Sequence, residues 1–209
     1  MSSNQLNLFD NQNNENGLKI NWQTEHIIHL KSLKNIGNAT IQQIINLCPD
    51  IDDWNIELFR GQIKEAAMNS LPEKFPFLDE SDPSKVISFL DSKYPQEFNS
   101  MGIDKPILLW YKGNLNLSKS IAVVGSRNIH PSTIEITNLF TEIAVEKGFN
   151  IVSGLALGTD TVGHKKAVEL NSTTTVILPS PINNIVPREN IKLANRILDN
   201  GGLFLSEYP

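Results

Sequence analysis

Cysteine is almost absent from this sequence: Cys48 is the only one among 209 residues. A single cysteine excludes an intramolecular disulfide and is typical of a reducing compartment. Long apolar runs are missing too, because no stretch approaches the roughly 18 apolar residues that a membrane-spanning helix needs. The N-terminus, MSSNQLNLFD, has neither the basic nor the apolar region of a secretion signal. We therefore expect a cytoplasmic protein without a membrane partner.

Positive charge is also scarce. The formal net charge is −5; residues 1–119 carry 11 Lys and Arg against 15 Asp and Glu, and residues 120–209 carry 7 against 8. A nucleic-acid partner would therefore have to be bound by a local group of cations. Four histidines and one cysteine give little support to a metal site. The motifs G-x-G-x-x-G and G-x-x-x-x-G-K-[ST] of nucleotide sites are absent, so we predict no cofactor.

Hydrophobic residues make up 40% of the sequence and charged residues 20%, which is typical of a globular protein with a substantial core. Composition divides the chain into four parts. Residues 1–19 are polar and rich in asparagine, as in a disordered tail. Residues 71–84 contain three prolines and no periodic pattern, as in a linker. We predict a small helical domain at 20–70 and a larger domain at 85–209.

The segment 20–70 has helical periodicity. TEHIIHLKSL at 24–33 and ATIQQIINL at 39–47 repeat their apolar residues at helical spacing, with Gly37 in the turn between them. A helix–turn–helix pair of this kind can direct backbone N–H groups at a phosphate, but it is more often only a compact helical hairpin.

From Ile121 onwards, strands alternate with helices. We predict strands at 121–125, 149–154, 173–180 and 202–207, separated by helices at 131–148, 159–170 and 188–200. A further strand, PILLWYKG at 106–113, precedes them. This alternation predicts a Rossmann-like α/β domain, in which right-handed crossovers join a mostly parallel sheet with helices on both faces.

Three loops follow the carboxyl ends of the predicted parallel strands, where ligands bind in such sheets. They are GSRN at 125–128, SGLALGTD at 153–160 and PSPINNIVPREN at 179–190. Glycine lets a backbone approach a ligand, serine offers donors, and arginine suits phosphate. We therefore predict an anion-binding site, against the simpler interpretation of tight turns with solvated arginines. The candidate residues are Gly125, Ser126, Arg127, Gly154, Gly158 and Arg188.

Asp160 and His164 stand four residues apart on one predicted helix, the spacing at which two side chains can touch. A base and the group that orients it would show this spacing, but no nucleophile lies nearby in the sequence. We favour a helix-capping Asp160 and a structural His164. We predict no catalytic residue and no enzymatic activity.

Together these motifs resemble the DNA-processing protein A family, also called DprA or Smf. The resemblance rests on Gly125-Ser126-Arg127, SGLALGTDTVGH at 153–164, VPREN at 186–190 and GLFLSEYP at 202–209. Upstream, KYPQEF and PILLWYKGN resemble the segment that leads into the fold in this family. A small helical domain, similar to a sterile-alpha-motif or helix-hairpin-helix domain, is common before it.

The resemblance implies a protein without enzymatic activity that binds single-stranded DNA, protects incoming DNA and helps to load the RecA recombinase during natural transformation. It also implies a homodimer that helps to displace single-stranded-DNA-binding protein, with Arg127 and Arg188 on DNA phosphates. Two departures reshape the pocket: LPSPINN at 178–184 replaces a glycine-rich loop, and Val186 replaces a tyrosine. The family continues beyond SEYP, so we expect a fragment, a truncation or a short relative.

The N-terminal QLNLF resembles the pentapeptide by which bacterial proteins dock on the DNA polymerase sliding clamp. Gln5, Leu6, Leu8 and Phe9 would be its contact residues, and a chance apolar cluster is the alternative. Two other functions stay open for the whole chain. One is a nucleotide-binding or nucleotide-processing Rossmann protein of the lysine-decarboxylase-like type, although its PGGxGTxxE motif is absent. The other is a degenerate partner subunit that has lost its site.

Overall fold

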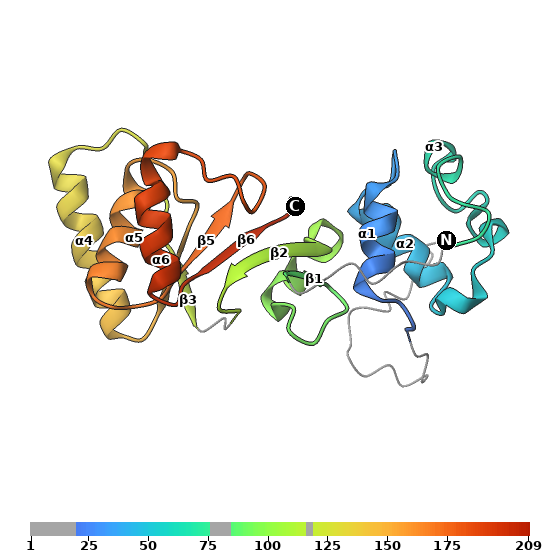
Figure 1. Ribbon diagram of the computed structural model, residues 1–209, viewed down its shortest axis with the longest axis horizontal. Coiled ribbons are helices and arrows are strands. Elements are labelled where there is room, and N and C mark those ends of the chain that lie inside the picture. The colour runs from blue at the N-terminus through green and yellow to red at the C-terminus, as the bar shows by residue number, and fades with distance from the viewer. Residues whose placement is uncertain (1–19, 76–84, 116–118) are drawn as a thin grey trace, which may run out of the picture. The chain divides into compact units, whose positions relative to one another are not determined.

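A computed structural model describes residues 20–75, 85–115 and 119–209. Its contacts divide the chain into two compact units that meet in sequence at Leu108 and Leu109. The four predicted parts of the chain, 1–19, 20–70, 71–84 and 85–209, include residues outside the described ranges, and their limits stay a prediction. Figure 1 shows the elements of both units in the order of the chain.

The first unit is mostly helical, as the spacing of its apolar residues predicts. Its elements are α1 (Thr24–Ser32), α2 (Asn38–Leu47), the 3-10 helices η1 (Ile51–Asp53) and η2 (Ile56–Phe59), α3 (Glu65–Met68), strand β1 (Val86–Ser88) and the 3-10 segment η3 (Gln96–Asp104). The apolar residues of α1 and α2 form the core of this unit, and Ile27, Leu30, Ile41, Ile44 and Ile45 are fully buried. Gly37 precedes α2 and is exposed, and its suggested contact with phosphate stays a prediction.

Aromatic rings close one side of this helical core. Trp22 is buried and donates a hydrogen bond of 2.7 Å from its indole nitrogen to the carbonyl of Cys48. Its ring packs edge-on against Trp54 and Phe75, with centroids 6.2 and 5.6 Å away. These rings therefore act in packing.

The second unit is an α/β sheet. It contains the strands β2 (Leu108–Gly113), β3 (Ser120–Ala122), β4 (Asn150–Ser153), β5 (Thr174–Leu178) and β6 (Leu203–Ser206), and the helices α4 (Pro131–Glu146), α5 (Thr159–Glu169), η4 (Arg188–Asn190) and α6 (Ile191–Asp199). Within this unit the strand order is β2-β6-β5-β4-β3. Strands β3 to β6 run parallel, and β2 pairs with β6 antiparallel. The predicted Rossmann-like α/β class is confirmed.

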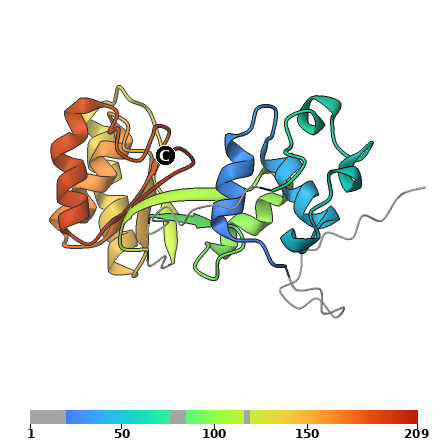
Figure 2. The same cartoon turned by 45° about the vertical axis from the view of Figure 1, so that its right-hand side comes forward.

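Helices α4, α5 and α6 lie side by side over the parallel strands (Figures 1 and 2). Register places Val176 and Phe204 on one face of the sheet, and both belong to the core cluster that includes residues of α5 and α6. Ile151, on the same face, packs with Ala144 of α4. The opposite face carries Ile177, which is 41% exposed. Among the described residues, α4, α5 and α6 therefore cover one face of the sheet, which differs from the prediction of helices on both faces. The reason is that right-handed crossovers between neighbouring strands return on the same side.

No helix in the described ranges is both long enough and apolar enough to cross a membrane.

Candidate nucleic-acid interface

The GSRN loop and the start of α5 lie against each other at the carboxyl ends of β3 and β4. Gly158 has a φ of +84°, and a Cβ there would lie 2.2 Å from the carbonyl oxygen of Ser126 and 2.5 Å from that of Arg127. A Cβ on Gly125 would lie 2.5 Å from Oγ1 of Thr159. Both positions need glycine because any side chain would separate the two segments.

Hydrogen bonds lock this contact. The carbonyl of Ser126 accepts from the backbone N–H of Thr159 at 3.1 Å and from its hydroxyl at 3.3 Å. The first N–H of α5 is therefore used by the GSRN loop. At the start of α4, Pro131 has no N–H, and the ring of His130 accepts from the N–H of Ser132 at 3.3 Å. An anion at the rim formed by the three loops, 125–128, 153–160 and 179–190, would therefore be bound by side chains more than by free helix N-termini.

The second loop is held from inside by the Asp160 side chain. Its Oδ2 accepts from the backbone N–H of Gly154 at 3.1 Å and of Ala156 at 3.3 Å. Gly158 occupies the N-cap position of α5 and makes no side-chain cap. The predicted helix-capping role of Asp160 is therefore wrong, because the carboxylate turns back to the loop that precedes the helix. A charged acceptor makes such bonds strong.

The third segment is tied to the second through Asn190. Its Nδ2 donates to the carbonyl of Leu155 and to the hydroxyl of Thr161, both at 2.8 Å. Leu155 is buried and has a φ of +59°, a left-handed conformation that a leucine keeps only where its surroundings impose it. Arg188 lies two residues before Asn190, so this bond places η4 beside the second loop.

The end of β6 supports the third loop, residues 179–190. Oγ of Ser206 donates to the carbonyl of Ser180 at 2.7 Å and accepts from the N–H of Tyr208 at 2.9 Å. Ile182 then donates its N–H to the carbonyl of Tyr208 at 3.3 Å. The SEYP motif therefore shapes the loop that carries the PSPINN sequence.

The structure gathers four of the six candidate residues into one contact: Gly125, Ser126, Arg127 and Gly158. Gly154 lies at the base of the second loop and is reached through Asp160. Arg188 makes no contact of this kind with the described residues; it is positioned by the hydrogen bonds of Asn190, two residues later, to Leu155 and Thr161. The side chains of Arg127 and Arg188 are both exposed, and neither forms an ion pair with any described residue. Gln5, Leu6, Leu8 and Phe9 lie outside the described residues.

Sequence reasoning missed Asn190 and Tyr208 as residues of this rim, and it assigned Asp160 a different role. Asp160 and Asn190 orient the second and third loops, a role that depends on contacts distant in the chain. Tyr208 is 54% exposed beside Ile182 and offers an aromatic face. Its place in the GLFLSEYP motif was the available signal.

His164 of α5 is buried and contacts the amino end of β5. Its Nδ1 lies 2.8 Å from the hydroxyl of Thr174, which itself donates to the carbonyl of Ile151 at 2.7 Å. Burial lowers the pKa of His164 to about 4, opposed only in part by the Asp160 carboxylate and the Ser153 carbonyl. The imidazole is thus neutral at pH 7, and its position agrees with a structural role.

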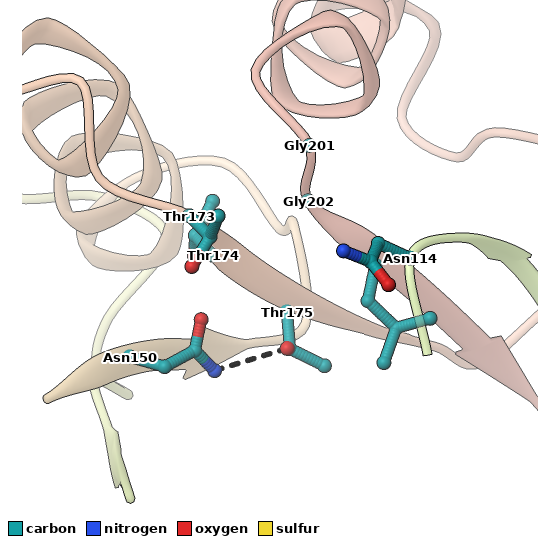
Figure 3. Close-up of a pocket in the computed structure, with 8 residues that line it drawn as sticks. Asn114, Asn150, Thr173, Thr174, Thr175, Gly201 and Gly202 are labelled. Carbon is teal, nitrogen blue, oxygen red and sulfur yellow. Dashed lines mark hydrogen bonds between the residues drawn. The ribbon is translucent and has the colours of Figure 1, made fainter. Parts of the chain in front are cut away.

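A hollow at the amino ends of β4, β5 and β6 is a second place to consider (Figure 3). Asn150 reaches into it, but its Nδ2 already donates to Ser120 at 3.2 Å and to Thr175 at 3.0 Å. The hollow has no charged side chain; its lining consists of Asn114, Asn150, Thr173, Thr174, Thr175, Gly201, Gly202 and Leu203. It therefore does not suit an anion. No group of metal-ligating side chains occurs in the described ranges.

These observations define a class: a Rossmann-like α/β protein with two exposed arginines on loops beyond the carboxyl ends of its parallel strands. The particular family follows from comparison with known proteins. The family model for DNA recombination-mediator protein A matches residues 85–209. The chain belongs to the DNA recombination-mediator protein A family.

Two curated relatives are similar to most of the chain. Protein Smf from Borreliella burgdorferi is 32% identical over an alignment of 182 residues, and the match covers 85% of this chain and 57% of that protein. DNA processing protein DprA from Streptococcus pneumoniae is 32% identical over an alignment of 188 residues, and the match covers 84% of this chain and 65% of that protein. The chain thus spans less than two thirds of the length of these relatives.

Two solved structures share the fold. DprA from Streptococcus pneumoniae superimposes with a TM-score of 0.66 and 27% identity, covering 89% of this chain and 68% of that one. DNA processing protein A from Helicobacter pylori, described for its single-stranded DNA binding mode, gives a TM-score of 0.51 and 28% identity, covering 59% and 55%.

Proposed function

We propose that this chain binds single-stranded DNA at the rim formed by its three loops and acts as a recombination mediator without catalytic activity. The observation that carries the proposal is the exposed Arg127 on a loop that is clamped to the start of α5. A rigid loop presents a guanidinium with little loss of entropy on binding. The single-stranded DNA binding of the Helicobacter pylori relative supports this assignment.

Arginine side chains would neutralise phosphates and leave the bases unread, as sequence-independent binding requires. Arg127 is the primary contact in this proposal, and Arg188 is the second. Tyr208 supplies an exposed ring on which a base could stack. Because Glu189 and Glu207 are exposed next to these residues in sequence, we expect binding to be weak and sensitive to salt.

The test is the fluorescence anisotropy of labelled oligo-dT titrated with the whole chain at several salt concentrations. Replacing Arg127 with alanine is expected to weaken binding and to reduce the slope of log K against log salt by about 0.7, the contribution of one single-strand phosphate. Arg196→Ala removes another exposed arginine, from the last turn of α6, and should leave the slope unchanged. Equal slopes for Arg127→Ala and the unmodified chain would refute the role of Arg127.

Tyr208 is tested by its own pair of variants. If its ring stacks on a base, Tyr208→Ala lowers affinity while the salt slope stays the same, and Tyr208→Phe keeps most of the affinity. Absence of oligo-dT binding at tens of micromolar, with binding of mononucleotides instead, would replace the DNA assignment by a small-nucleotide site.

We propose three protein partners from the family resemblance: RecA, single-stranded-DNA-binding protein and a second copy of the chain. Faster RecA assembly on oligonucleotides coated with single-stranded-DNA-binding protein would support the mediator role, and sedimentation would report the dimer. A sliding clamp is a further proposed partner, through QLNLF. Pull-down by purified clamp should be lost in the Leu8→Ala and Phe9→Ala double variant, and a lack of retention at high protein concentration would exclude the clamp.

A further inference from the structure

Helix α4 exposes its large apolar residues and buries small or polar ones. Thr137, Thr141 and Ala144 are its buried side chains. Four large apolar residues face outward, with exposed fractions of 67%, 59%, 44% and 43% for Ile136, Leu139, Phe140 and Ile143. A surface helix of a globular protein normally has the reverse arrangement.

The four exposed residues form one continuous surface, which we call the α4 stripe: Ile136, Leu139, Phe140 and Ile143. Their spacing of i, i+3, i+4 and i+7 places them on one side of the helix. This is the spacing at which one helix packs against another. Contiguous exposed apolar surface of this kind marks interaction sites.

Carboxylates border one edge of the α4 stripe. Glu135, Glu142 and Glu146 are spaced i, i+7 and i+11, which sets them along the same edge of the helix. Glu142 forms an ion pair of 3.0 Å with Lys166 of α5. Glu135 and Glu146 are exposed and form no ion pair with any described residue.

This charge pattern selects among partners. Two copies of α4 that packed antiparallel about a twofold axis would place one acidic edge against the other, which like charges oppose. A helix with Lys or Arg along one flank would instead meet the acidic edge with opposite charge.

We propose that the α4 stripe is the docking surface for an amphipathic helix of a partner protein, whose apolar side is flanked on one edge by basic residues. The apolar residues supply the buried area, and Glu135 and Glu146 set the orientation and the preference for a basic flank. The inference does not depend on DNA binding, because the stripe lies on α4 and contains no residue of the rim.

The probes are two synthetic helical peptides with the same leucine stripe, one with lysines and one with glutamates along one flank, each carrying a fluorescent label. Titrated with the whole chain, the lysine peptide should bind saturably and more weakly as salt rises. The Leu139→Gln and Phe140→Gln double variant should weaken that binding at least tenfold. Met101→Gln, which alters an apolar residue 48% exposed in the first unit, should leave binding unchanged.

Charge reversal separates this proposal from non-specific apolar adhesion. The Glu135→Lys and Glu146→Lys double variant should now prefer the glutamate peptide, while circular dichroism stays that of the unmodified chain. Equal binding of both peptides, or no saturation up to a few hundred micromolar, would overturn the proposal. So would a dimer in sedimentation that Leu139→Gln with Phe140→Gln converts to monomer, since a second copy would then occupy the stripe.

Discussion

At the scale of single residues, the rim depends on places where two backbones meet closely. The carbonyls of Ser126 and Arg127 occupy the space where a side chain at Gly158 would begin. His164, buried on α5 against Thr174 of β5, is a neutral imidazole with a strongly lowered pKa. The close contact at Gly158 makes the rim sensitive to an added side chain.

Gly158→Ala should separate the GSRN loop from α5. The added Cβ meets backbone oxygens at 2.2 and 2.5 Å, and alanine also disfavours the φ of +84°. We expect a loss of about 3 kcal/mol in the free energy of unfolding, and a matching loss of oligo-dT binding, because strain and overpacking add. Urea unfolding and anisotropy measure the two effects.

The control for this change is Gly148→Ala, at a φ of +75° with open space around its Cβ. It carries the conformational cost alone, about 1 kcal/mol. Equal losses in the free energy of unfolding of the two variants would show that the close approach of Gly158 to the Ser126 and Arg127 carbonyls does not affect stability.

His164 should make stability fall in mild acid. Its pKa is lowered from 6.5 to about 4 in the folded protein, so the unfolded chain takes up the proton first as pH falls. The stabilising contribution is present above the unfolded pKa and decreases toward pH 4, by about 2 kcal/mol between pH 7 and pH 5. Urea unfolding at both pH values should show this loss. Between pH 7 and pH 5, the free energy of unfolding of His164→Gln should fall by about 2 kcal/mol less than that of the unmodified chain. Identical losses in both proteins would contradict the assignment.

At the scale of elements, the loops are positioned by side chains that reach back from the helices. Asp160 of α5 holds the backbone of the second loop, and Asn190 at the start of α6 holds the carbonyl of Leu155. The helices therefore determine where the exposed arginines lie.

Asp160→Ala should loosen the second loop while α5 persists. The N–H groups of Gly154 and Ala156 lose a charged acceptor, which corresponds to about 3 kcal/mol for two such bonds. Hydrogen exchange of these two amides should accelerate, and oligo-dT affinity should fall. Glu169→Ala, which removes a carboxylate from a 4.0 Å surface pair at the other end of α5, should change neither. Unchanged exchange in Asp160→Ala would contradict this role.

At the scale of the whole molecule, the chain forms two compact units, and Cys48 belongs to the first. Its side chain is 1% exposed, and burial, with Asp53 and Asp50 adding to it, raises the pKa of its thiol to about 11. Because this is the only cysteine, its reactivity reports on the first unit alone.

Cys48 should react with a thiol reagent at pH 8 at least about a hundredfold more slowly in the native protein than in urea. A pKa raised by about two units lowers the thiolate fraction about a hundredfold, and burial slows attack further. Absorbance of the released thiolate measures the rate. Saturating oligo-dT should leave the rate unchanged, because the proposed site lies in the second unit. Fast reaction of the native protein would contradict the burial of Cys48.

The sequence by itself determined the succession of elements and the family. Apolar periodicity predicted α4, α5 and the strands between them, because helices and strands of this length follow local spacing. Gly125-Ser126-Arg127 and SGLALGTD predicted which loops meet at the rim, since parallel strands end at a common edge.

Tertiary structure decided the rest, because it brings together residues that are distant in the chain. Only the fold shows that the Ser126 carbonyl takes the first N–H of α5, and that Asp160 holds a loop instead of capping a helix. The spacing of apolar residues likewise predicts an apolar side of α4, but it does not show whether that side faces the core or the solvent. In the structure, Thr137 and Ala144 face the core and Phe140 faces outward, because α5 and β4 meet the side with small residues.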